Sequence, residues 1–244
     1  MTDGVLIPQW PAPANVRARV TTRALAGHSQ APFERCNLGL RSGDDVDAVL
    51  ANRAGLIDAL NLPGTPRWLR QVHGIDVVDA SSVNDEVQAD AAIARDARVV
   101  LAVLTADCLP LLLTRDDGSI VAAAHAGWRG LAAGIIETTL ARMAAPAEQV
   151  LAWLGPAIGP RSYEVGADVR SSFVDRDAAS AAAFTPTRAG HWWCDLYALA
   201  RRRLLDAGVH NVFGGDFDTL TDARFYSYRR EARTGRFASL IWRV

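Results

Sequence analysis

The sequence lacks the features that mark several classes of protein. Its 244 residues carry 26 basic and 27 acidic side chains, so it has neither a basic excess to attract nucleic acid nor a polyacidic segment. The longest apolar runs, 99–104 and 109–113, are too short to cross a bilayer. The apolar run 5–7 stops at Pro8, which is not typical of a secretory signal. We therefore expect a cytoplasmic protein that binds neither nucleic acid nor membranes.

Cysteine is scarce, and its placement argues against two common roles. The three cysteines, Cys36, Cys108 and Cys194, are far apart and form no CxxC pair. Disulfide frameworks and zinc fingers need paired spacings, so neither is expected. No internal repeat or long linker divides the chain. The sequence therefore indicates one domain over 1–244, with 1–21 as an N-terminal lead-in.

Apolar patterning predicts both strands and helices. Buried strands are expected over 99–105, 109–114, 120–125 and 150–154, with a hairpin around the DDG turn at 116–118. Helices are expected over 131–143, ending before Pro146, and from an N-cap at Asp195 to Gly208. The stretches 225–230 and 237–242 predict a terminal hairpin. Because the order shows no βαβ repeat, we expect a layered α/β or α+β domain with a mixed sheet flanked by helices.

Two histidines and one cysteine stand in short polar stretches beside glycine or at the ends of apolar runs. They are His73 in QVHG, Cys108 in TADC and His125 in HAGWRG. Zinc binds imidazole nitrogen and thiolate sulfur, and a catalytic zinc has three protein ligands and an open fourth position. The spacings are not those of a zinc finger, so three separate elements would have to converge. The pattern predicts a metal site made by His73, Cys108 and His125.

The same residues allow other interpretations. Cys108 could be a nucleophile activated by His125, as in Cys–His hydrolases, or both could be ordinary core residues. Arg129 stands where the HAGWRG turn enters the expected helix, so it could bind an anion at the helix N-terminus or form a structural salt bridge. Asp107 could exchange a proton, but strand neighbours point to opposite faces, so it could also lie behind the site.

Several motifs in a fixed order resemble the YfiH family, also called the polyphenol oxidase or laccase-domain family, which includes the mammalian purine-metabolism protein FAMIN. The resemblance runs from about Thr22 to the C-terminus. The motifs are RCNLGLRSGDD (35–45) with NR (52–53), QVHG (71–74), ADAAIA (89–94), TADCLPLLL (105–113), HAGWRG (125–130), GPAIGP with YEVG (155–166), and SYRR…TGR (227–236).

The resemblance implies a fold, a metal and an activity. The fold is an α/β fold of its own, distantly similar to toxin cysteine hydrolases. The implied metal is zinc on His73, Cys108 and His125, with copper possible in its place. The implied activities are phosphorolysis of adenosine, inosine and methylthioadenosine, and deamination of adenosine. One departure is Asp218–Thr219, where the family often has a Cys–Thr dipeptide.

We therefore expect a zinc-dependent purine nucleoside enzyme that uses phosphate. Arg129 and the metal would hold the phosphate, and Asn37 and Arg41 would contact the nucleoside. Three alternatives remain: a copper polyphenol oxidase, a Cys–His hydrolase acting on cell-wall precursors, and a protein in which zinc is only a structural clip. A multicopper laccase is disfavoured because its copper clusters need many histidines and this chain has five. For deamination, the HxE…PCxxC signature of zinc deaminases is absent.

Overall fold

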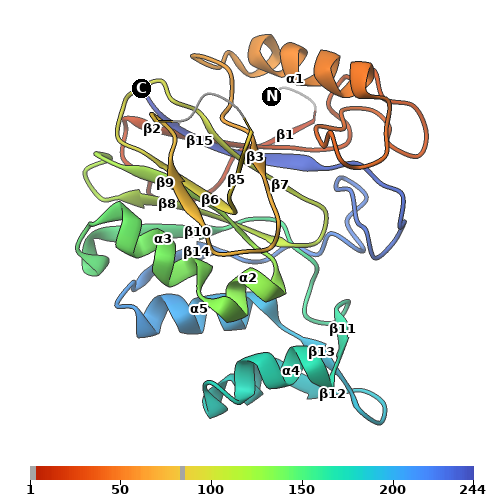
Figure 1. The fold of residues 1–244 in the computed structure, drawn as a ribbon, viewed down its shortest axis with the longest axis vertical. Helices are drawn as coiled ribbons and strands as arrows, with labels where there is room; N and C mark the ends of the chain where they lie inside the picture. Colours follow the sequence, from red (N-terminus) through yellow and green to blue (C-terminus); the bar gives the residue numbers. More distant parts are fainter. Residues whose placement is uncertain (1–3, 83–85) are drawn as a thin grey trace.

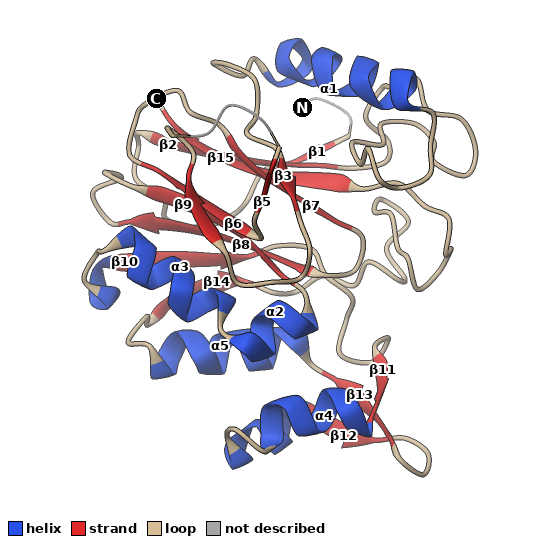
Figure 2. Cartoon of the chain, in the orientation of Figure 1, coloured by secondary structure: helices blue, strands red, loops and turns tan. Residues whose placement is uncertain are grey.

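Two β-sheets pack face to face through the middle of the molecule, and helices cover their outer faces (Figures 1 and 2). The computed structural model describes residues 4–82 and 86–244. From one side to the other, the layers are helix α1 (Val46–Leu60), a four-stranded sheet, a six-stranded sheet, and a helical layer. The helical layer contains α2 (Trp128–Ala133), α3 (Ile135–Met143) and α5 (Leu196–Asp206).

The six-stranded sheet is mixed, as the sequence predicts. Its order is β14 (Asn211–Gly214), β10 (Val150–Leu154), β8 (Leu109–Arg115), β9 (Val121–Ala126), β6 (Ala91–Ala94) and β4 (Val77–Asp79). The two edge strands pair in parallel and the inner pairs are antiparallel. Helices cover one face and the second sheet covers the other, so β8 and β9 are buried at nearly every position and are mostly apolar.

The four-stranded sheet is antiparallel and joins the two ends of the chain. Its order is β1 (Val5–Leu6), β2 (Val16–Thr21), β15 (Phe237–Arg243) and β7 (Leu101–Thr105). Two smaller sheets complete the strands. One pairs β3 (Leu69–Arg70) with β5 (Val87–Gln88). The other contains β11 (Glu164–Gly166), β13 (His191–Cys194) and β12 (Phe184–Pro186), in a lobe with α4 (Ala167–Val174) that projects from the body (Figure 1).

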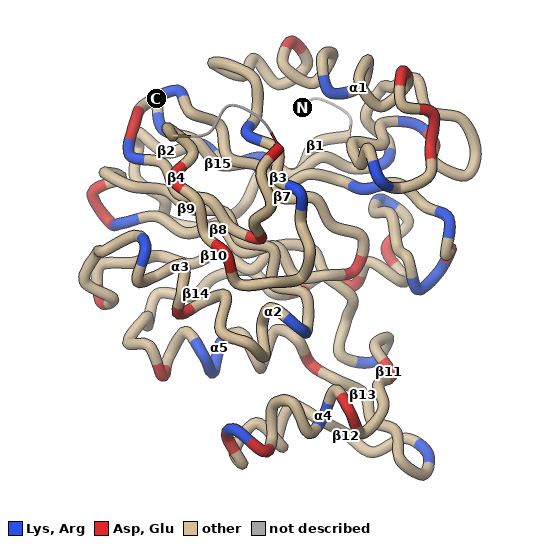
Figure 3. The backbone as a smooth tube through the Cα atoms, viewed as in Figure 1, with Lys and Arg blue, Asp and Glu red and all other residues tan. Residues whose placement is uncertain are grey.

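The four strands predicted from apolar runs are confirmed, and so is the hairpin of β8 and β9. Asp195 caps α5 by accepting a hydrogen bond from the backbone N–H of Ala198 at 2.9 Å. None of the helices formed by the described residues is long and apolar enough to cross a membrane. In Figure 3, basic and acidic residues are interspersed along the backbone, in keeping with the balanced charge.

Two details of the prediction were wrong. The helix expected over 131–143 begins earlier, at Trp128, and Gly134 divides it into α2 and α3 with a φ of 116°. The expected terminal hairpin does not form, because 225–230 is a turn segment and β15 pairs with β2 and β7 instead. Within the stretch expected as an N-terminal lead-in, residues Val16–Thr21 form β2, an inner strand of the four-stranded sheet. Strand pairing between distant segments decided the last two points.

The helix break at Gly134 leads to a stability prediction. Gly134→Ala should lower the free energy of unfolding by about 1 kcal/mol, because a side chain disfavours a φ of 116°. Gly55→Ala is the matched control: it lies inside α1 with open space around its Cα, and the substitution should raise stability by up to about 1 kcal/mol. Urea denaturation measures both, and equal effects of the two substitutions would contradict the role of Gly134.

Candidate metal centre and active site

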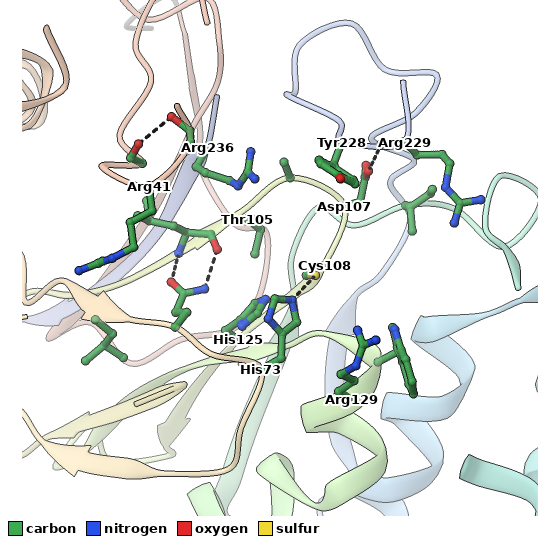
Figure 4. A pocket seen from close by; sticks show the side chains of 18 of the residues that line it. Arg41, His73, Thr105, Asp107, Cys108, His125, Arg129, Tyr228, Arg229 and Arg236 are labelled. Atoms are coloured by element: carbon green, nitrogen blue, oxygen red, sulfur yellow. Dashed lines mark hydrogen bonds between the residues drawn. The ribbon is translucent and has the colours of Figure 1, made fainter. Parts of the chain in front are cut away.

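Three separate elements bring His73, Cys108 and His125 together, and the three side chains point toward one another in Figure 4. His73 lies in the turn between β3 and β4, Cys108 in the turn before β8, and His125 in β9. Their ligand atoms all lie within 4.8 Å of one another. Cys108 Sγ is 3.7 Å from His73 Nε2. The two imidazole rings meet edge to face with centroids 4.7 Å apart.

The arrangement fits a metal ion. Tetrahedral zinc, with bonds of about 2.0 Å to nitrogen and 2.3 Å to sulfur, separates these two ligand atoms by about 3.5 Å. Gly127 has no side chain and so leaves room for the cluster. A Cβ at this position would lie 2.8 Å from His73 Cδ2 and 3.1 Å from Cys108 Sγ. The cluster is the only group of three such ligands that the described residues form.

A buried carboxylate that the sequence analysis did not single out orients both histidines. Asp90 is fully buried, and its Oδ1 lies 2.8 Å from His125 Nδ1. The carboxylate also accepts the backbone N–H groups of Val72, His73 and Gly74 at 2.7–3.1 Å. The contact to Nδ1 leaves His125 Nε2 free to bind a metal, the usual arrangement of a carboxylate behind a histidine ligand. The only sequence signal was a lone acid inside the apolar ADAAIA motif.

Cys108 and His125 shift each other's ionisation in the metal-free protein. Burial disfavours the thiolate, but His125 and His73 outweigh it and lower the pKa of Cys108 to about 6. Burial likewise disfavours the imidazolium, but the Cys108 thiolate and the Asp90 carboxylate raise the pKa of His125 to about 9. A thiolate that is stable at neutral pH is the form that binds a metal or attacks an electrophile.

The cluster forms part of the wall of a cavity of about 510 Å³, a size typical of small-molecule sites. Most of its charged lining residues are basic. Among the described residues that line the cavity, Asp107 is the only carboxylate, whereas five are arginines: Arg41, Arg53, Arg129, Arg229 and Arg236. The cavity therefore suits a ligand that carries negative charge.

Arg129 is the arginine with the most freedom to bind a ligand. Its guanidinium stacks over the Trp128 ring at 4.3 Å, and within the described residues it makes no hydrogen bond or salt bridge. The alternative of a structural salt bridge is therefore not supported by the structure. The helix it belongs to, α2, is only six residues long, so the side chain rather than the helix N-terminus is the feature available to an anion.

Arg229 and Arg236 were not predicted as site residues, and only their places in the SYRR and TGR motifs hinted at them. Arg229 donates to the carbonyl of Glu164 at 3.1 Å and stacks over the Tyr163 ring. Arg236 donates from Nη1 to the carbonyls of Thr234 and Gly235, and burial lowers its pKa. Each keeps further N–H groups that no described residue binds.

Asp107 lies in the cavity wall, but its oxygens are engaged by protein groups. Oδ1 accepts the Thr219 hydroxyl at 2.6 Å and Oδ2 accepts the backbone N–H of Arg229 at 2.7 Å. The neighbouring Asp218 accepts Gly159 N–H and the Ser162 hydroxyl. The Asp218–Thr219 pair therefore ties three loops together beside the cavity, without entering its lining.

Of the two residues expected to contact the nucleoside, Asn37 and Arg41, only Arg41 lines the cavity. Asn37 is fully buried outside the cavity wall, and its side chain binds Ser42, Asp44 and the backbone N–H of Gly39 and Arg236. Since those groups use its amide, direct contact with a substrate is not supported. Arg41 lies in the lining and pairs with Glu86 at 2.8 Å, as does Arg53 at 2.6 Å.

The role of Asp90 predicts a loss of metal affinity when its charge is removed. Asp90→Asn should weaken metal binding by about 10–100-fold, because an amide cannot accept all the hydrogen bonds and can favour the wrong tautomer of His125. Competition with a chromophoric chelator measures the affinity. Asp79→Asn, which removes a partly exposed ion pair with Arg95, is the control. Unchanged affinity with a lower melting temperature would mean that Asp90 only supports the fold.

The low pKa of Cys108 predicts selective alkylation of the metal-free protein. Iodoacetamide should modify Cys108 at a rate that falls as the pH drops through about 6, because the thiolate is protonated below that pH. Cys36 and Cys194 should not react, since burial raises the pKa of both thiols, that of Cys36 to about 12. Mass spectrometry locates the label, and added zinc should block it. A rate that rises only toward pH 9 would contradict the shift.

Comparison with known proteins identifies a family and several relatives that resemble this chain over almost its whole length. The family model described as multi-copper polyphenol oxidoreductase laccase matches residues 17–244. A Pseudomonas aeruginosa protein named purine nucleoside phosphorylase is 52% identical over 239 residues, covering 97% of both chains. The Escherichia coli protein named purine nucleoside phosphorylase YfiH is 48% identical over 242 residues, covering 98% of this chain and 99% of that one.

A solved structure agrees with the fold. The crystal structure of the Neisseria meningitidis protein NMB0706 has a TM-score of 0.95 and 43% identity, and the match covers 99% of both chains. The sequence similarity and the structural similarity both extend over almost the whole chain. The chain belongs to the YfiH family of laccase-like proteins.

Proposed function

We propose that the protein is a metal-dependent purine nucleoside phosphorylase whose active site is the cavity above His73, Cys108 and His125. The observation that carries the proposal is the meeting, in one cavity, of three residues that could hold a metal ion and an arginine, Arg129, that forms no hydrogen bond or salt bridge with the described residues. The names of the relatives support nucleosides and phosphate as substrates. We propose adenosine, inosine and methylthioadenosine as nucleosides, zinc as the metal and adenosine deamination as a second activity.

In this proposal, the arginines of the cavity bind the phosphate. Guanidinium groups bind phosphate oxygens through paired, charge-assisted hydrogen bonds. Arg129 offers all of its N–H donors, and Arg229 and Arg236 offer those that the backbone carbonyls leave free. Figure 4 shows Arg129 and Arg236 on different sides of the cysteine and histidine group. A phosphate in the cavity could therefore meet three arginines that form no salt bridge with the described residues, Arg129, Arg229 and Arg236.

The reaction follows from holding phosphate and nucleoside together. A phosphate oxygen forms a bond to ribose C1′ while the bond from C1′ to the purine nitrogen breaks, and the base leaves with the electron pair and takes up a proton. The products are the free base and ribose 1-phosphate, or 5-methylthioribose 1-phosphate when the substrate is methylthioadenosine. Fixing the two reactants in one orientation lowers the barrier, and the arginines stabilise the charge on the phosphate. Zinc held by His73, Cys108 and His125 would supply a Lewis acid at the wall of the cavity.

A second candidate function rests on the thiol. The pKa of Cys108, which His125 and His73 lower, also suits a Cys–His hydrolase that uses Cys108 and His125 on an amide, such as one in a cell-wall precursor. The two functions respond differently to a chelator, which stops a metal enzyme and leaves a thiol nucleophile active. Copper at the same three ligands is the alternative metal, because the Irving–Williams order favours copper over zinc.

The proposal predicts a phosphate-specific effect at Arg129. With adenosine, the wild-type protein should form adenine and ribose 1-phosphate only when phosphate is present. Arg129→Met should raise the KM for phosphate about tenfold or more, because charge-assisted hydrogen bonds are lost, and should leave metal content unchanged. Product analysis by chromatography and metal analysis by mass spectrometry measure these quantities. Arg142→Met, an exposed arginine on α3, is the control.

Several outcomes separate the alternatives. Loss of metal and turnover in Cys108→Ala, with both retained in Cys36→Ala, would support a metal enzyme. Inosine formed from adenosine without phosphate would identify deamination. Activity that survives a chelator but not alkylation would favour the hydrolase, and an absence of nucleoside turnover in the zinc-loaded protein would overturn the proposal.

A further inference from the structure

Tyr228 is a large aromatic side chain that the structure leaves uncovered at the cavity. It lines the cavity, and 57% of its surface is exposed. The residues just before it are buried: Phe225, Tyr226 and Ser227 are each fully inaccessible. The Tyr226 hydroxyl donates to the carbonyl of Phe33 at 2.9 Å. The exposure therefore begins abruptly at Tyr228.

The residues after Tyr228 are also held in place. The backbone N–H of Arg229 donates to Asp107 Oδ2 at 2.7 Å. The Arg230 guanidinium donates to the carbonyls of Thr219, Leu220 and Phe225 at 2.6–3.0 Å. Because contacts on both sides fix the backbone, the exposed ring is presented by an anchored turn. Hydrophobic burial alone would place such a ring inside the protein.

The other aromatic side chains of the lining already have a partner on one face. The Arg129 guanidinium lies 4.3 Å from the Trp128 ring, and the Arg229 guanidinium lies 5.3 Å from the Tyr163 ring. Among the described residues, no aromatic ring or guanidinium stacks on Tyr228, and no group hydrogen-bonds to its hydroxyl. Tyr228 is therefore the lining aromatic with an open face beside the arginines.

We propose that Tyr228 binds the substrate by stacking on the flat face of the purine base. The inference rests on the proposed function, because it takes the purine nucleoside from there and adds the residue that recognises its base. Stacking of a base on an aromatic ring contributes substantially to binding and needs no particular ring substituent. With the base on Tyr228 and the phosphate on the arginines, the bond between sugar and base lies between the two groups.

This role has a recognisable signature. Stacking does not discriminate between substituents at purine C6, so loss of the Tyr228 ring should weaken the binding of adenosine and of inosine by similar factors. Phenylalanine retains the ring and should act like tyrosine, whereas leucine keeps apolar bulk without the aromatic face. If the hydroxyl instead formed a hydrogen bond with the substrate, both the phenylalanine and the leucine variants would bind the substrate more weakly.

The first experiment measures binding without turnover. Adenine is titrated into the zinc-loaded protein in a calorimeter, in wild type, Tyr228→Phe, Tyr228→Leu and Leu205→Ala. We expect about tenfold weaker binding in Tyr228→Leu, from the energy of stacking, and binding within about twofold of wild type in Tyr228→Phe. Leu205 is 56% exposed on α5 and serves as the control for removing an exposed apolar side chain. Melting temperatures should be unchanged, since Tyr228 is exposed.

Steady-state kinetics give the second readout. Tyr228→Leu should raise the KM for adenosine and for inosine about equally, and should leave the KM for phosphate and the metal content unchanged. Adenine affinity that is equal in wild type and Tyr228→Leu, or that is lost in Tyr228→Phe, would overturn the stacking role, as would a wild-type protein that does not bind adenine. Adenine binding that depends on the ring, in a protein without phosphorolysis, would support the stacking and reject only the proposed reaction.

Discussion

The site depends on one buried carboxylate. Asp90 is fully inaccessible to solvent, and an isolated buried charge is costly unless hydrogen bonds satisfy it. Here three backbone N–H groups and the His125 ring supply those bonds, and they lower the pKa of Asp90 although burial opposes this. The same bonds hold the turn that carries His73 and set the orientation of His125. Satisfying one buried charge therefore also places two of the three residues that could hold a metal ion.

Other parts of the site adopt backbone conformations that side chains disfavour. His73 has a φ of 62° and Asp107 a φ of 91°, both in the left-handed region. Each is held by hydrogen bonds, the first through Asp90 and the second through Thr219 and Arg229. Such strain gathers at functional sites, where surrounding contacts can maintain it. In this protein it turns His73 and Cys108 toward the same point.

The family description speaks of several coppers, whereas the chemistry of this chain suits a single ion. The described residues form one cluster of three ligands, and a blue copper site with a trinuclear centre needs many more. The cavity beside the cluster is rich in arginine, which suits an anionic substrate better than a neutral phenol. Phosphate therefore explains the charge of this cavity more directly than oxidation of phenols does.

By itself, the sequence determined the buried strands, the β8–β9 hairpin, the cap of α5 and the three residues, His73, Cys108 and His125, that could hold a metal ion. These depend on local patterns: apolar runs, turn residues, and histidine or cysteine at strand ends. The tertiary structure decided the partners of β15, the role of β2, the burial of Asn37 and the convergence of Asp90, Arg229, Arg236 and Tyr228 on the site. These depend on contacts between residues far apart in the chain, and local patterns do not encode which distant segments will meet.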